Sequence, residues 1–441
     1  MSGIAEVMLN LGYQVSGSDL KRSPVTLRLK KRGARIFYGH KAKNMAGANL
    51  VVVSSAVGAS NPEVSQARKE SVTVIPRAEM LAELMRLKTN VAVAGTHGKT
   101  TTTSLIGTIV SEAGLDPTLI IGGRVNNLRG NARLGKGEFL IAEADESDRS
   151  FLKLTPTIAV ITNIDPEHME NYEDFKDVCA SFTEFANKVP FYGAVVACAD
   201  HPEVRKILPT INRRVVTYGL KGDAEYTATH VTQEGLNMSF DVHHKTERLG
   251  RASIRQPGIH HVSNALAAIV VARELDIPFS KIVRGLKKFS GVERRFQILR
   301  AAHPMIIDDY GHHPVEIEAT LQAARAGWPG FKIVVVMQPH RFTRLRLLFD
   351  DFATVLSKAD WIGILPVYAA GESPIAGFTS ERLAERIRTM KSCSTVHFAK
   401  NLQEFAPVLK QWADEKTILL CLGAGDISKM AKDLAKKWNS L

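Results

Sequence analysis

A glycine-rich segment with one lysine and a run of threonines carries the strongest chemical signal in the chain. Residues 91–103 read VAVAGTHGKTTTT, so an apolar run leads into Gly95, Gly98, Lys99 and Thr100. Such a strand, turn and helix start binds nucleotide phosphates. The glycines let backbone N–H groups approach, the lysine reaches the terminal phosphates, and the threonine ligates Mg²⁺. Only two residues separate these glycines, against four in the common pattern, so an ordinary turn is the alternative. We expect ATP or GTP binding here.

Carboxylates follow two further apolar segments. The stretch FLIAEADESD (139–148) brings Glu143 and three more acidic residues to the end of an expected strand. In AVITNIDPEHMENY (159–172), a second expected strand is followed by Asp165, Glu167 and His168. Parallel strands bind ligands at their carboxyl ends, and Mg²⁺ prefers oxygen ligands. The sequence therefore predicts a magnesium site. A charged surface loop and a structural histidine are the alternatives.

Two segments in the middle of the chain could contact a nucleotide. GIHHVSNALAA (258–268) places His260 and Asn264 four residues apart, on one face if a helix begins early. Asn264 could bond a base or ribose, or cap the helix. ERRF (293–296) places Arg295 at a domain boundary, where it could reach a phosphate or form a surface salt bridge.

Three segments near the C-terminus also follow expected strands. DDYGHHPVE (308–316) joins Asp309 and His312 in one loop, but further ligands for a transition metal are not evident. QPHRFTRLR (338–346) offers His340, Arg341 and Arg344, which suit an anionic substrate or a solvated helix start. GAGDI (423–427) reads as a plain strand-to-helix turn.

Alternating strands and helices predict an α/β protein with three domains, at 1–90, 91–294 and 295–441. In the first domain we expect helices at 3–11, 25–32, 62–69 and 78–87, strands at 13–16 and 49–54, and a parallel sheet. The central domain should have strands at 91–94, 139–143, 158–162 and 193–197, an antiparallel hairpin insertion at 215–256, and a helix at 262–274. The third domain is expected to be a further α/β unit, with strands at 305–308, 332–337, 361–365, 395–398 and 417–422.

Composition narrows the class of protein. The 441 residues include 45% hydrophobic types, and no apolar run approaches the length of a membrane span. Four scattered cysteines and the absence of a secretory pattern favour a reduced, cytoplasmic protein. The net charge of +12 is spread along the chain, so pockets for small polyanions are favoured over a nucleic-acid partner.

The segments GTHGKTTT, EADESD, TNIDPEH, HHVSNALAA, ERRF, DDYGHHPVE, QPHRFTR and GAGDI occur in this order between residues 95 and 427. This set closely resembles the Mur ligase family of peptidoglycan synthesis. Together with EADESD and PHRFTR, VVSSAV (52–57) narrows the resemblance to the alanine-adding branch. The resemblance implies a Rossmann-like UDP-sugar domain, a central ATPase domain and a Rossmann-like amino-acid domain. It further implies that ATP phosphorylates the lactyl carboxylate of UDP-N-acetylmuramate, and that the amine of L-alanine then attacks the acyl phosphate.

The resemblance also implies roles for individual residues. The expected catalytic residues are Lys99, Glu143, His168, Arg341 and Arg344, and the expected Mg²⁺ ligands are Thr100, Glu143 and His168. Those expected to bind ATP are Gly95, Thr96, His97, Gly98, Lys99, Thr100, Thr101, His260, Asn264, Arg295 and Asp309. Those expected to bind the other substrates are Ser18, Asp19, His40, Ser54, Ser55, His312, His340, Arg341 and Arg344.

The N-terminus departs from the family pattern. MSGIAEV matches the segment after the family's first strand and glycine-rich loop, so the true start lies upstream or the chain is truncated. In a truncated chain we expect a missing central strand and exposed strand edges in the first domain. The alternative functions are a murein-tripeptide-recycling ligase, an inactive ATP-binding paralogue and a nucleic-acid-binding NTPase. We expect a monomer or homodimer without membrane or nucleic-acid partners.

Overall fold

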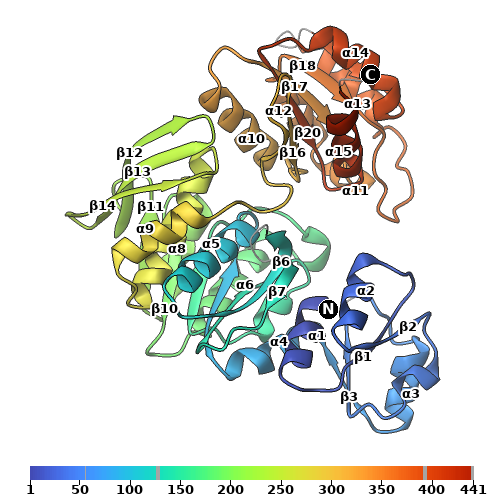
Figure 1. Ribbon diagram of the computed structural model, residues 1–441, viewed down its shortest axis with the longest axis vertical. Coiled ribbons are helices and arrows are strands. Elements are labelled where there is room, and N and C mark those ends of the chain that lie inside the picture. Colours follow the sequence, from blue (N-terminus) through green and yellow to red (C-terminus); the bar gives the residue numbers. More distant parts are fainter. Residues whose placement is uncertain (55, 126–129, 391–394, 439–441) are drawn as a thin grey trace. The chain divides into compact units, whose positions relative to one another are not determined.

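The computed structural model describes residues 1–54, 56–125, 130–390 and 395–438, which form two units (Figure 1). The first unit comprises Met1–His230, Phe240–Ser253 and Ser263–Ser290. The second comprises Val231–Ser239, Ile254–Val262 and Gly291–Leu441. Within the described residues, no helix is both long enough and apolar enough to cross a membrane.

The N-terminal part of the first unit alternates helices and strands, as predicted, but its strands form two separate pairs. The elements are α1 (Ser2–Asn10), β1 (Ser16–Asp19), α2 (Pro24–Lys31), β2 (Arg35–Tyr38), β3 (Leu50–Val53), α3 (Pro62–Lys69), β4 (Thr73–Pro76) and α4 (Arg77–Arg86). Strand β1 pairs in parallel with β2, and β3 with β4. Among the described residues, β1 and β3 therefore have one strand partner each.

The first strand begins later than predicted. Residues 13–16 were expected to be extended, but the strand is Ser16–Asp19. The chain is still turning at Tyr13, because Gly12 adopts a φ of 90° and the Tyr13 N–H donates back to the Met8 carbonyl at 3.1 Å.

A ten-stranded sheet follows, and most of its residues belong to the first unit. Its strands are β5 (Thr89–Ala94), β6 (Thr118–Val125), β7 (Gly130–Arg133), β8 (Phe139–Glu143), β9 (Ile158–Ile161), β10 (Ala194–Cys198), β11 (Val215–Gly219), β12 (Tyr226–Glu234), β13 (Asn237–His244) and β14 (Glu247–Ile254). Their order is β14-β13-β12-β11-β10-β9-β5-β8-β6-β7. Its helices are α5 (Lys99–Glu112), α6 (Phe175–Asn187), α7 (Pro202–Ile207), α8 (Ile259–Glu274) and α9 (Phe279–Lys288).

The segment 215–256, expected to be a hairpin insertion, forms strands that continue the main sheet at one end. Strand β11 pairs in parallel with β10, and β12 pairs in parallel with β11 through Tyr218 and Tyr226. Both tyrosines are buried, so this pairing extends the core instead of leaving a solvated hairpin.

Strand β5 lies at the centre of the sheet, in parallel between β8 and β9. Val91 to Ala94 are fully buried, as expected for a strand that helices cover on both faces. Helices α5 and α9 pack closely, because a Cβ on Gly285 would lie 2.6 Å from the Ile109 Cα (Figure 1). The residues after β5 thus emerge at the carboxyl edge of a rigid parallel sheet, where such sheets bind ligands.

The second unit has a six-stranded sheet of order β15-β16-β20-β17-β18-β19, parallel except for β15. The strands are β15 (Gln297–Arg300), β16 (Met305–Asp309), β17 (Lys332–Met337), β18 (Trp361–Ile364), β19 (Thr395–Phe398) and β20 (Thr417–Leu422). The helices are α10 (Pro314–Gly327), α11 (Phe342–Leu347), α12 (Phe349–Leu356), α13 (Ser380–Arg388), α14 (Leu402–Trp412) and α15 (Ile427–Lys437).

Alternate strand residues of this sheet enter two different cores. Val335 packs with α10, α12 and α13, whereas Val334 and Val336 pack with α14 and α15. This is the two-faced arrangement expected of a Rossmann-like domain. The loops after β16, β17 and β20 therefore meet at one edge, and they carry the predicted segments 310–313, 338–341 and 423–426.

Candidate functional site

The turn between β5 and α5 needs a glycine at each of its two ends. Gly98 caps α5 with a φ of 84°, and a Cβ there would lie 2.6 Å from Asn264 Oδ1. Gly95 has a φ of 133°, and its Cβ would lie 2.0 Å from Thr162 Oγ1. Asn264, predicted to contact the nucleotide, therefore lies directly against the turn. The turn has the backbone conformation that a phosphate-binding loop needs.

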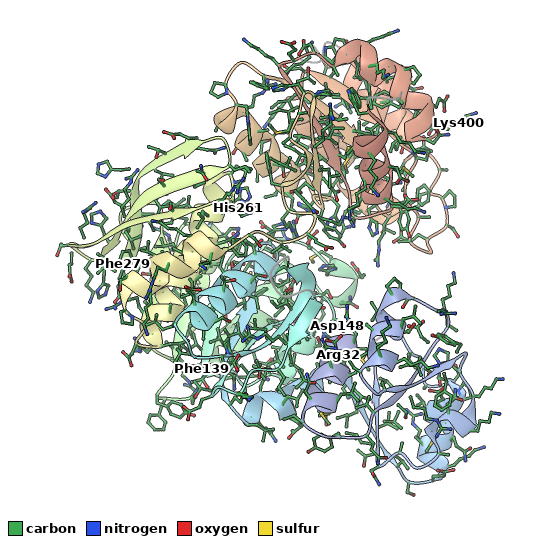
Figure 2. All side chains as sticks on the ribbon, in the orientation of Figure 1. Arg32, Phe139, Asp148, His261, Phe279 and Lys400 are labelled. Carbon is green, nitrogen blue, oxygen red and sulfur yellow. The ribbon has the colours of Figure 1, made fainter. Side chains whose placement is uncertain are left out.

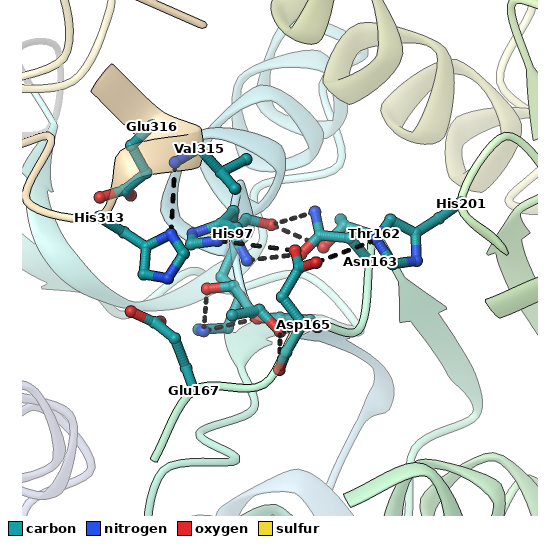
Figure 3. Close-up of polar contacts among 12 residues, drawn as sticks. His97, Thr162, Asn163, Asp165, Glu167, His201, His313, Val315 and Glu316 are labelled. Atoms are coloured by element: carbon teal, nitrogen blue, oxygen red, sulfur yellow. Dashed lines mark hydrogen bonds and ion pairs between the residues drawn. The ribbon is translucent and has the colours of Figure 1, made fainter. Parts of the chain in front are cut away.

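Residues after β9 hold this turn in place (Figure 3). Asn163 accepts from the His97 N–H at 2.7 Å and donates back to the His97 carbonyl at 3.0 Å. Thr162 donates to the same carbonyl at 2.7 Å. Asp165 Oδ2 lies 3.7 Å from His97 Nε2, and Asp165 Oδ1 lies 3.4 Å from His201 Nε2. The turn is thus ordered by the neighbouring strand.

Lys99 is the most enclosed cation of the site. Its Nζ donates to the carbonyls of Gly95 and Thr96 at 2.6 and 3.1 Å and to Glu146 Oε1 at 2.7 Å. Burial opposes its charge, but Glu146 and the nearby acidic residues outweigh burial and raise the pKa of Lys99. Burial raises the pKa of Glu146, whose Oε2 has no hydrogen-bond partner in the described structure. Lys99 therefore stays charged, and its three N–H donors are engaged by these three acceptors.

Glu143 meets the first turn of α5. Its Oε2 accepts from Thr100 Oγ1 at 3.1 Å, and its Oε1 accepts from the Gly122 N–H at 2.7 Å. Burial raises the pKa of this carboxyl, so a divalent cation beside it would relieve an electrostatic cost. A hydroxyl and a carboxylate in contact are the oxygen donors that Mg²⁺ accepts together with phosphates and water.

The remaining acidic residues and His168 are less closely joined to the turn. In Figure 2, Phe139 opens β8 and Asp148 lies in the loop that follows it, where Asp148 accepts from the Ser150 N–H at 3.0 Å. The described ion pairs of His168 are with Glu167 and Glu170, both at 3.9 Å. Among the described residues no group of three or more His, Cys, Asp or Glu could by itself hold a metal ion. A metal role for His168 stays a prediction.

The start of α5 suits an anion. Gly98 offers no side chain to cap the helix, so the first N–H groups, including those of Lys99, Thr100 and the buried Thr101, have no acceptor within the helix. A nucleoside triphosphate with its cation would fit these donors together with Lys99 and the Thr100–Glu143 pair.

Two of the predicted UDP-binding residues come together in the N-terminal part. Ser18 Oγ lies 2.9 Å from His40 Nδ1 and donates to Glu63 Oε2 at 2.7 Å. Asp19 instead ends β1, where its Oδ1 accepts from the Lys21 N–H. Ser54 follows β3, and its carbonyl accepts from the Val57 N–H at 3.0 Å. Ser55 lies outside the described residues.

In the second unit, Arg295 is paired and stacked. Its Nη1 donates to Glu316 Oε1 at 3.0 Å, and its guanidinium lies 5.4 Å from the centre of the Tyr310 ring. Burial works against the charge of Arg295, but Glu316 outweighs it and raises the pKa. His260, on α8, stacks on His261 at 4.1 Å, and burial holds the pKa of His260 well below its usual value. His260 is therefore a neutral ring.

Asp309 was predicted to contact a nucleoside, but its oxygens already accept two backbone N–H groups. Oδ2 accepts from Phe296 and Oδ1 from Gly311, both at 2.7 Å. Burial raises the pKa of Asp309 to about 6. These bonds position the loops that carry Arg295 and His312, which is a supporting role that its sequence position did not reveal.

The predicted amino-acid residues gather beside β17. The His312 and His340 rings meet edge to face at 5.9 Å, and His340 stacks on Tyr368 at 5.5 Å. Arg341 is the N-cap residue of α11, and Arg344 lies in the last turn of that helix. His313 is the N-cap residue of α10, and its Nδ1 accepts from the Val315 N–H at 3.4 Å (Figure 3). Glu316 lies in the first turn of the same helix.

Sequence reasoning missed the roles of three carboxylates that organise these clusters. Glu63 joins Ser18 to Asn44, Glu146 holds Lys99, and Glu316 holds Arg295. Glu146 and Glu316 lie inside segments that were singled out, so their acidic type was the available signal. Glu63 carried no signal beyond its place in the first turn of α3.

Three family models match the chain in sequence order. They are described as "Mur ligase family, catalytic domain" over residues 1–89, "Mur ligase middle domain" over 93–272 and "Mur ligase, glutamate ligase domain" over 294–425.

Curated relatives and solved structures agree with these matches. The chain is 52% identical over 98% of its length to the UDP-N-acetylmuramate–L-alanine ligase of Geobacter sp. (strain M21), covering 94% of that protein. It is 49% identical over 99% of its length to the enzyme of the same name from Syntrophotalea carbinolica, covering 95% of it. The crystal structure of the UDP-N-acetylmuramate–alanine ligase of Thermotoga maritima matches with a TM-score of 0.82 at 30% identity, over 100% of this chain and 96% of that one.

Proposed function

Because this chain belongs to the Mur ligase family, we propose that it joins L-alanine to the lactyl carboxylate of UDP-N-acetylmuramate in peptidoglycan synthesis, with ATP as the energy source. The observation that carries the proposal is the turn at Gly95–Gly98, with Lys99 charged and Thr100 in contact with Glu143. A ligase that activates a carboxylate with ATP needs this arrangement.

The chemistry follows from the weak electrophilicity of a carboxylate. Transfer of the terminal phosphate to the lactyl carboxylate makes an acyl phosphate, and the departing phosphate then leaves as the amine of alanine attacks. Lys99 and the N–H groups at the start of α5 would offset the charge that builds up on the transferred phosphoryl group. Asn264, His260 and Arg295 would contact the rest of the nucleotide.

Mg²⁺ fits beside α5. Thr100 and Glu143 would hold it, and His168 is the proposed further ligand. When bound, the ion supplies positive charge to the phosphate oxygens. The buried carboxyl of Glu143, whose pKa is raised in the absence of a cation, supports this assignment.

The three segments would divide the substrates among them. We assign UDP binding to residues 1–90 around Ser18 and His40, ATP binding to 91–294, and alanine binding to 295–441 through His340, Arg341 and Arg344. We also infer that the enzyme works in the cytoplasm as a monomer or homodimer. The buried, unpaired Cys198 and Cys421 are in keeping with a reducing compartment.

Phosphate release tests the proposed function. The chain is incubated with ATP, Mg²⁺ and L-alanine, with and without UDP-N-acetylmuramate, and the product is identified by mass. We expect release only with both substrates, and a product heavier by one alanyl residue. ATP binding without release would refute the ligase. Release with the murein tripeptide but not with alanine would assign the recycling reaction instead.

A further inference from the structure

The ring of His312 lies between two hydrogen-bond acceptors. Its Nδ1 is 3.1 Å from the Tyr310 carbonyl oxygen and 3.2 Å from Glu316 Oε2. Neither oxygen has a proton to donate, because one is a carbonyl and the other belongs to a carboxylate paired with Arg295 at 3.0 Å. The proton of a neutral His312 ring therefore lies on Nδ1, and the lone pair lies on Nε2.

Glu316 also fixes the orientation of this ring. Its Oε2 accepts from the His312 N–H at 3.1 Å as well as facing the ring nitrogen, so the backbone and the side chain of His312 are tied to one carboxylate. Glu316 is itself nearly buried, with a side chain that is 10% exposed. A carboxylate that holds the Nδ1–H of a histidine is the arrangement that prepares Nε2 to accept a proton.

The face of His312 that carries Nε2 is not closed by a polar partner. Nothing in the described part of the chain forms a hydrogen bond to Nε2, and the ring is 16% exposed. The neighbouring ring of His340 is uncharged, because burial and then His312, Arg344 and Arg341 lower its pKa to about 4. His340 Nδ1 is also buried without a described partner.

We propose that His312 is the general base that takes a proton from the ammonium group of L-alanine. This inference rests on the proposed function, in which Arg341 and Arg344 bind the alanine carboxylate. Alanine arrives as a zwitterion, and its ammonium nitrogen has no lone pair with which to attack. A base beside the carboxylate-binding arginines would supply the missing step.

The step balances as follows. His312 Nε2 takes one ammonium proton and becomes an imidazolium, which Glu316 stabilises. The amine nitrogen forms a bond to the acyl carbon, and the bond from that carbon to the phosphate oxygen breaks. The second proton from nitrogen goes to the departing phosphate. The imidazolium then releases its proton to water and is ready for the next turnover.

The test compares two amines in the variant His312→Gln. L-Alanine needs a base, whereas hydroxylamine is uncharged at neutral pH and traps the acyl phosphate as a hydroxamate without one. We expect the rate of alanine addition to fall about 10²- to 10³-fold, the range of general-base catalysis, while hydroxamate formation stays within about threefold of the unaltered enzyme. The exposed His303 provides a matched control, and His303→Gln should leave both rates unchanged.

Glu316→Gln provides a second variant. An amide that donates to Nδ1 would move the ring proton to Nε2, so alanine addition should again fall more than hydroxamate formation. Equal loss of both reactions in His312→Gln would make His312 a structural residue and overturn the inference, and an unchanged alanine rate would also overturn it. If the unaltered enzyme itself makes no alanine adduct, the proposed function fails, and the inference fails with it.

Discussion

Removing Lys99 should destabilise the fold as well as abolish turnover, because it leaves a buried carboxylate without its cation. The side chains of Lys99 and Glu146 are 18% and 5% exposed, and their charged atoms lie 2.7 Å apart. Loss of one partner of a buried pair costs about 3–5 kcal/mol. We expect about 3 kcal/mol for Lys99→Ala, since burial favours uptake of a proton by Glu146. At about 2 °C per kcal/mol, the unfolding midpoint of the first unit should fall by about 6 °C.

The double variant Lys99→Ala/Glu146→Gln isolates this effect. Its neutral amide removes the unpaired charge, so most of the lost stability should return while ATP turnover stays absent. Scanning calorimetry measures the unfolding transitions of both units, and tryptophan fluorescence identifies the transition of the second unit. All four tryptophans lie in that unit: Trp328, Trp361, Trp412 and Trp438.

The stability lost in Lys99→Ala should also depend on pH, with a larger loss at higher pH. In Lys99→Ala the folded-state pKa of Glu146 is raised above its unfolded value, so the stability from this group is present at low pH and is lost as pH rises through the folded pKa. The single variant should therefore approach the unaltered enzyme at mildly acidic pH, and the double variant should show no such trend. A single variant as stable as the unaltered enzyme, or a double variant no better than the single, would refute the reasoning.

Three further predictions concern other parts of the site. Gly98→Ala should weaken ATP binding by at least about tenfold in titration calorimetry, because its methyl group would lie 2.6 Å from a side-chain oxygen of α8. Gly114→Ala has a similar φ and open space around it, so a matching loss there would show that strain alone is responsible. Arg341→Ala should raise KM for alanine about tenfold or more with little change in KM for ATP, and Arg346→Ala should change neither. Asp309→Asn should remove the part of the stability that falls as pH rises through about 6, measured by urea unfolding; a pH dependence like that of the unaltered enzyme would contradict the assigned pKa.

Local patterns were enough to predict the strands that helices cover on both faces. Strands β17 and β20 begin and end where predicted, since each contains a run of five apolar residues. Strands β2 and β4 were missed, because four half-exposed residues carry neither an apolar run nor a clear alternation. The predicted strands at 13–16 and 193–197 were displaced by the turns that precede them.

In the candidate site, too, local patterns could be predicted from the sequence and long-range pairs could not. The phosphate-binding turn is a local pattern, so its spacing could be recognised without knowing the fold. The carboxylates that bind the other site residues are distant from them in the sequence. The separation is 47 positions for Glu146 and Lys99, 45 for Glu63 and Ser18, and 21 for Glu316 and Arg295. Such pairs depend on the order of strands in each sheet, which one sequence does not reveal.

The turn at Gly95–Gly98 is held by residues that are made much later in synthesis. Its hydrogen bonds come from Thr162 and Asn163, about 65 positions further along the chain, and β5 needs both β8 and β9 as neighbours. A chain emerging from the ribosome N-terminus first therefore carries the glycines and Lys99 long before they can adopt their final shape. Nucleotide binding should thus be absent during translation until β9 has joined the sheet, and a nascent chain that ends before Asn163 should have the binding motif but no binding site.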